Sequence, residues 1–217
     1  MVTETHAPPQ RTTDVAWAWI TGVSGLVANA LLVAFFALAR PFEAAANEYS
    51  WLGSANDLVI VVQFATFIPV ALALWGRMPA TRGVLVATAA AVAAMAAVIV
   101  LQLLLVTGGL RFDRQVVLVC AAFIGVYAWI LTVGSAGHRE AALPRVVTRL
   151  GLLLGASYPL GLLIAAPGLL FPWGSTAQYA FLAPGALFAS IGWLALPFWP
   201  LALARHVFHD SSKESVA

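Results

Sequence analysis

Residues Val84–Thr107 read VLVATAAAVAAMAAVIVLQLLLVT, without one charged side chain. About 20 helical residues cross a bilayer core about 30 Å thick, since each residue rises about 1.5 Å. The run is therefore long enough to span a membrane as a single helix. A strand of a membrane β-barrel would instead alternate polar and apolar residues over about ten positions, so the sequence favours a helix.

Five further runs share this length and apolar character, and the composition of the whole chain is also typical of a membrane protein. Of its 217 residues, 62% are hydrophobic and only 9% are charged, whereas soluble domains carry about 25% charged residues. The sequence predicts an all-α, polytopic integral membrane protein in which residues 15–205 form one six-transmembrane-helix bundle. Two short tails (1–14 and 206–217) and a long outer loop (40–56) complete it. The predicted spans lie near Val15–Ala39, Asp57–Trp75, Val84–Thr107, Val116–Ser135, Val146–Phe171 and Phe181–Ala204.

The distribution of basic residues predicts the orientation. Eight lie on the side that holds both chain ends, and three (Arg40, Arg111 and Arg114) lie on the other. Because cytoplasmic segments carry the excess of Lys and Arg, an N-in/C-in topology is expected. The strong bias toward Arg over Lys, with abundant Ala, Val, Gly and Leu, indicates a high-GC bacterium and hence its plasma (inner) membrane.

Several function classes are disfavoured by what the chain lacks. Lys and Arg form no run, so no nucleic-acid partner is expected. The single Cys120 cannot form an intramolecular disulfide or a cysteine-based metal site. The four His lie in the tails or in an inner loop. We therefore expect no metal and no cofactor.

Polar side chains within the spans indicate a candidate binding pocket. In hydrocarbon such groups seek partners, so they are expected to point into the bundle beneath the outer loop. A mostly apolar cavity with a few polar groups suits a hydrophobic small molecule or a lipid. In the alternative reading these amides only join neighbouring helices, and Arg111 pairs with a carboxylate or a lipid phosphate. The candidate ligand-binding residues are Gln63, Gln102, Asn29, Tyr127, Tyr158, Trp51 and Arg111.

Four carboxylates near the outer helix ends are candidate catalytic groups. A carboxyl group at the mouth of an apolar pocket is more readily protonated and can act as a general acid. Asp57 has a structural explanation too, as a charge that favours a helix N-terminus. The candidates are Glu48, Asp57, Glu43 and Asp113.

Three functions follow from these features. The first is a multi-pass protein that binds or passes a hydrophobic or weakly polar molecule in an outward-opening pocket. The second is a membrane-embedded lipid or isoprenoid enzyme, a cyclase or isomerase, that uses the outer carboxylates. The third is an accessory subunit, for which the Ala-rich third span would pack closely on other helices. The expected partners are the lipid bilayer, a hydrophobic ligand, and a second copy or a partner subunit.

Overall fold

The computed structural model describes residues 10–39, 48–172 and 174–209, apart from the side chains of residues 10, 11 and 113. Every regular element in these ranges is helical. Three short segments, η1 (Phe35–Ala39), η2 (Ala166–Leu170) and η3 (Ala204–Phe208), continue α1, α5 and α7 respectively. The α-helices are α1 (Gln10–Ala34), α2 (Trp51–Trp75), α3 (Arg82–Val106), α4 (Phe112–Arg139), α5 (Arg145–Ala165), α6 (Thr176–Ala195) and α7 (Phe198–Leu203).

Six of the described helical stretches are long and apolar enough to cross a membrane, which confirms the predicted number of apolar helices. Two boundaries differ from the prediction by five residues or more. The sixth stretch begins at Thr176 rather than near Phe181. The second stretch begins at Trp51 rather than near Asp57, so residues 51–56 are helical and do not belong to the preceding loop. The stretches are Thr12–Ala39, Trp51–Trp75, Arg82–Val106, Arg114–Arg139, Arg145–Leu170 and Thr176–Phe208.

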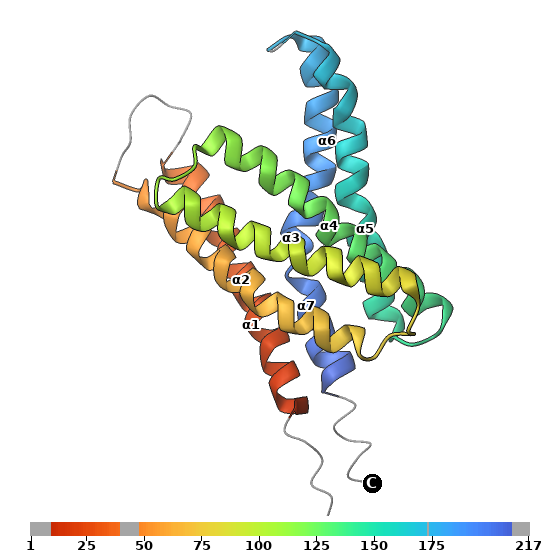
Figure 1. Ribbon diagram of the computed structural model, residues 1–217. Coiled ribbons are helices and arrows are strands. Elements are labelled where there is room, and N and C mark those ends of the chain that lie inside the picture. Colours follow the sequence, from red (N-terminus) through yellow and green to blue (C-terminus); the bar gives the residue numbers. More distant parts are fainter. Residues whose placement is uncertain (1–9, 40–47, 173, 210–217) are drawn as a thin grey trace, which may run out of the picture.

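From α1 to α6, each helix packs against the next one in the sequence, and the series closes where α7 packs on α1. We call the end at which α1 begins and η3 ends the termini end, and the opposite one the far end. At the termini end, α7 and η3 seal the bundle against α1. At the far end, α5 and α6 rise as a hairpin away from α1–α4 (Figure 1).

Aromatic side chains fill the core where the helices converge. Phe67, Trp129 and Trp199 are all at most 1% exposed and meet edge to face, with ring centroids 5.6 Å apart for Phe67–Trp129 and 5.3 Å for Trp129–Trp199. Each indole N–H finds a partner: Trp129 Nε1 donates to Thr88 Oγ1 at 3.2 Å, and Trp199 Nε1 donates to the Val147 carbonyl at 3.2 Å. The core is thus apolar, and both buried indole N–H groups donate a hydrogen bond.

Small residues bring the backbones of α4, α5 and α6 together. A Cβ built at Gly161 would lie 2.6 Å from the Ala189 nitrogen and 2.6 Å from the Gly185 oxygen. One at Gly155 would lie 2.6 Å from Cα of Leu131. Close backbone approach through small residues is how helices associate in lipid, where burial of apolar surface supplies no driving force.

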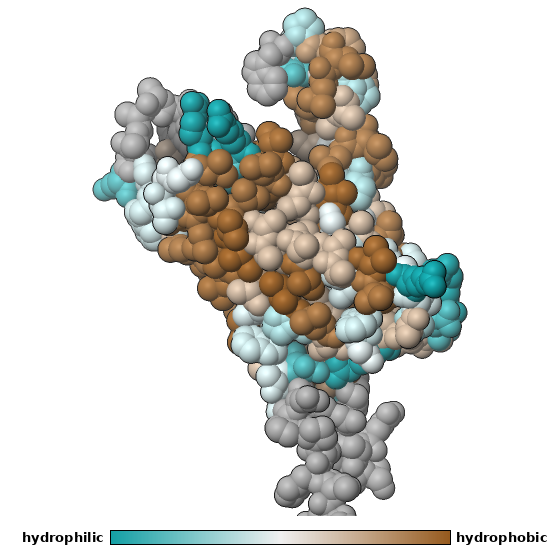
Figure 2. Space-filling view, viewed as in Figure 1, coloured by the Kyte–Doolittle hydropathy of each residue, from teal (hydrophilic) through white to brown (hydrophobic). Residues whose placement is uncertain are grey.

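The outside of the bundle is apolar. Large side chains such as Val86, Val117 and Leu153 are 66–70% exposed. Figure 2 shows this hydrophobic surface between hydrophilic groups at the ends of the described helices. Such a surface is suited to lipid rather than to water.

Candidate functional site

A cavity of about 530 Å³ lies toward the far end, and residues from all six long helices line it. Its lining is mainly aliphatic and aromatic. The polar members are Asn56, Asp57, Gln102, Gln115, Cys120, Tyr158 and Ser190. The volume falls within the range of about 300–1,000 Å³ typical of small-molecule sites.

Four of the polar side chains form one layer of the cavity. Asn56 and Asp57 lie five and six residues after the start of α2, Gln102 lies four before the end of α3, and Gln115 lies three after the start of α4. At about 1.5 Å per residue, this layer is about 5–9 Å from the far ends of these helices. Gln115 Nε2 donates to Gln102 Oε1 at 2.8 Å, so the layer also joins α3 to α4.

Asn56 is the least satisfied member of this polar layer. It is 6% exposed, and its Oδ1 has no hydrogen-bond partner among the described residues. Asp57, which follows it in the chain, is half-buried and also lines the cavity. An unpartnered buried oxygen costs about 1–3 kcal/mol, so Asn56 favours an occupant that can donate a hydrogen bond to it.

Aromatic side chains build the deeper wall. Trp193 on α6 meets Phe123 on α4 edge to face, with ring centroids 4.6 Å apart. The Tyr158 ring stacks on Tyr127 with centroids 4.7 Å apart, and its hydroxyl donates to the Cys120 carbonyl at 3.2 Å. These contacts fix the wall, and the hydrogen bond of Tyr158 to the backbone satisfies its donor.

The cavity opens sideways. Val33 and Phe36 of the first stretch and Phe112 at the start of α4 line it, and they are 61%, 45% and 63% exposed. The mouth is thus continuous with the apolar exterior of the bundle.

A break in the last transmembrane stretch positions one side of the cavity. Pro197 lacks the N–H that would continue the hydrogen bonds of α6, and α6 ends at Ala195. Asn29 Nδ2 of α1 donates to the Leu194 carbonyl at 2.9 Å, just before the break. Gly25 leaves space for this approach, since a Cβ there would lie 2.7 Å from Cγ of Pro197.

The structure brings three of the candidate ligand-site or catalytic residues together, namely Asp57, Gln102 and Tyr158, which all line the cavity. The other candidates with described side chains are not among its lining residues. Of these, Asn29, Gln63 and Tyr127 lie within the bundle, while Glu48, Trp51 and Arg111 are exposed near the far end. Glu43 lies outside the described residues, as does the side chain of Asp113.

The interpretation of Asp57 as a charge at a helix N-terminus is wrong. Because α2 begins at Trp51, Asp57 lies in its second turn, beyond the first turn within which the helix dipole acts. The structure places Asp57 in the lining of the cavity instead.

Three residues that line the cavity were not among the predicted site residues, namely Asn56, Gln115 and Ser190. A signal for the first was present. Asn56, Ile60, Gln63 and Phe67 recur at helical spacing, and all four are buried. Asn56 therefore belongs to the inward face of α2, the same face as Gln63, which was predicted as a ligand-binding residue.

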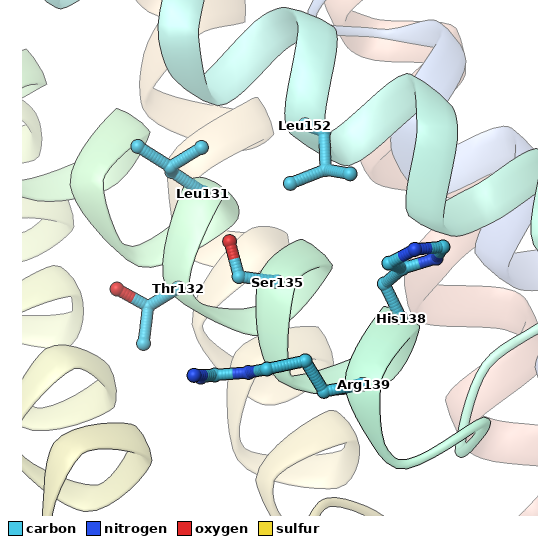
Figure 3. A pocket seen from close by; sticks show the side chains of 6 residues that line it. All are labelled: Leu131, Thr132, Ser135, His138, Arg139 and Leu152. Carbon is cyan, nitrogen blue, oxygen red and sulfur yellow. The ribbon is translucent and has the colours of Figure 1, made fainter.

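A second hollow, of about 480 Å³, lies at the termini end between α4 and α5. Figure 3 shows Ser135 between Leu131 and Leu152, with His138 and Arg139 near the end of α4. None of the predicted site residues lines it. Within the described part of the chain, no three His, Cys, Asp or Glu side chains gather as a metal site would require.

The chain was compared with families, with individual proteins and with structures. No protein-family model, no curated protein and no solved structure matches it. The cavity at the far end is therefore interpreted from its own geometry and chemistry.

Proposed function

We propose that this protein is a multi-pass membrane protein that binds a hydrophobic or weakly polar small molecule, or a lipid, in the cavity at the far end. The observation that carries the proposal is the lining itself, an apolar chamber with four polar side chains at one level. Its sideways mouth gives a ligand dissolved in the bilayer a direct route of entry.

The proposal includes an orientation in which the far end faces outward. Arg77, Arg82, Arg139, Arg145 and Arg205 are at the termini end, and the positive-inside rule places that end in the cytoplasm. A green fluorescent protein fused to the C-terminus is expected to fluoresce, and an alkaline phosphatase fused there is expected to stay inactive. An active phosphatase would contradict this orientation and move the cavity to the inner leaflet.

Binding is tested by filling the cavity. Ser190→Trp places an indole at an exposed position that belongs to the lining, whereas Ala183→Trp adds the same group to an exposed position of α6 outside the lining. Lipids extracted from the native host are expected to raise the thermal unfolding temperature of the purified wild type and of Ala183→Trp, and to have little effect on Ser190→Trp. Equal stabilisation of all three proteins would refute binding in this cavity.

A second candidate function is catalysis on a bound lipid, and the position of Asp57 favours it. This half-buried residue is the one candidate carboxylate with a described side chain that lines the cavity. As a general acid it would protonate a substrate held against the apolar wall. Mass spectrometry of host lipids incubated with the protein is expected to reveal a product that Asp57→Asn cannot form. If both proteins leave every lipid unchanged, the binding function stands without catalysis.

A further inference from the structure

The polar layer of the cavity indicates which class of molecule it accepts. Resting on the proposed function, we infer that the ligand is an amphiphile whose head donates a hydrogen bond and carries no negative charge. The head lies at Asn56 and Asp57, and the apolar body lies against the deeper wall.

The first argument is the unpartnered oxygen of the Asn56 amide. Asn56 is 6% exposed and lines the cavity, and its amide oxygen can only accept hydrogen bonds. This Oδ1 has no hydrogen-bond partner in the described part of the chain. A buried acceptor without a donor discriminates strongly between ligands that supply a donor and ligands that do not.

The second argument is the charge of the lining. Asp57 is the only charged side chain among the described residues that line the cavity, and none of these residues is Lys, Arg or His. An anionic head would therefore meet a carboxylate without a neutralising cation among these residues. Since like charges at short range in a poorly solvated site repel strongly, acids and phosphate-headed lipids are disfavoured.

The third argument is depth. The polar layer lies near the far ends of α2, α3 and α4, while Val119, Ala189 and Trp193 line the cavity further from these ends. A ligand with its head in the layer thus has its body directed toward the middle of the bundle or out through the sideways mouth. This is also how an amphiphile lies in one leaflet of a bilayer.

The test compares three probes with the same chain on the unaltered protein: hexadecanol, hexadecyl methyl ether and hexadecanoate. The alcohol donates a hydrogen bond, the ether only accepts one, and the acid is anionic at neutral pH. Binding is measured by displacement of a fluorescent fatty alcohol in detergent micelles. The alcohol is expected to bind about tenfold more tightly than the ether, as one hydrogen bond to a buried acceptor provides. The acid is expected to bind more weakly still.

A variant locates this preference. Asn56→Leu removes the unpartnered oxygen and is expected to reduce the preference for alcohol over ether to less than twofold. Gln63→Leu makes the same kind of change on the same helix, outside the cavity lining, and is expected to keep the full preference. If Asn56→Leu does not fold, the comparison of the three probes on the wild type still decides the question.

The outcomes separate this inference from the proposed function. If all three probes bind equally and Ser190→Trp weakens them all, the cavity is a binding site and the inferred head group is wrong. If hexadecanoate binds most tightly, the charge argument is overturned. If no probe binds with any dependence on Ser190→Trp, the proposed function itself is contradicted.

Discussion

Replacing Gly155 by Ala tests the close packing of α4 on α5, which supports the deeper wall of the cavity. The new methyl group would lie 2.6 Å from Cα and 2.6 Å from Cβ of Leu131. Carbon atoms pack best at about 3.5–4.0 Å, so the two helices must separate by about 1 Å. The obstacle includes backbone, which cannot rotate away as the end of a side chain can.

The two contributions to the effect can be estimated. Overpacking costs about 1–3 kcal/mol, and the upper part of this range applies where backbone is in the way. Replacing Gly by Ala inside a helix returns about 0.5–1 kcal/mol. The net expectation is a loss of about 1–2 kcal/mol in the free energy of unfolding. In a chain of this size, each kcal/mol corresponds to about 2–4 °C in Tm.

A matched control separates packing from helix propensity. Gly83 lies in the first turn of α3, and a Cβ there would meet nothing within 4 Å. Gly83→Ala is therefore expected to leave Tm unchanged or raise it slightly, whereas Gly155→Ala lowers it. Thermal unfolding of both purified variants in the same detergent measures the difference. If Gly155→Ala is as stable as Gly83→Ala, the reasoning on backbone approach is refuted.

Two further predictions concern polar groups in and near the core. The Tyr127 hydroxyl is fully buried and has no hydrogen-bond partner among the described residues. Tyr127→Phe is therefore expected to leave the free energy of unfolding unchanged or to raise it by about 1 kcal/mol. A clear fall in Tm would mean that a bound water or ligand satisfies the hydroxyl. Arg77 contacts Asp14 at 3.0 Å and lies over the Phe208 ring at 4.4 Å, both at the termini end, so Arg77→Ala is expected to lower stability by only about 1 kcal/mol. High salt is expected to reduce the difference in Tm between Arg77→Ala and the wild type. A difference in Tm that salt does not change would show that the ion pair contributes nothing to stability.

The helices were predictable because their signal is local. The length and apolar character of a run such as Val84–Thr107 can be read without reference to the rest of the chain, and six apolar helical stretches are present as expected. The start of α2 was less predictable. Ser54 and Asp57 resemble an N-terminal cap, yet the helix already begins at Trp51, because a capping pattern that falls within a helix cannot be told from a real cap by spacing alone.

The site was predictable only in part, because it depends on which helix faces meet. Gln102 was identified as a buried amide, but its partner Gln115, 13 residues away and on the next helix, becomes evident only once α3 and α4 are packed together. Asn29 shows the opposite case. Its depth suggested a place in the pocket, but its amide is used by the carbonyl of Leu194 next to a helix break. A proline in the sequence predicts such a break. Which side chain then donates to the carbonyl beside the break depends on how the helices pack.

The contacts at the termini end bear on the position of α6. On the far-end side of the break at Pro197, α6 is a helix of 20 residues, about 30 Å long, that packs along α5, whereas the contacts of this stretch with α1 come mainly from α7 and η3. A rotation of about 10° at the break would move the opposite end of α6 by about 5 Å, given the rise of about 1.5 Å per residue. A change where α7 packs on α1 would therefore have its largest effect at the far end, where α5 and α6 rise away from α1–α4 (Figure 1).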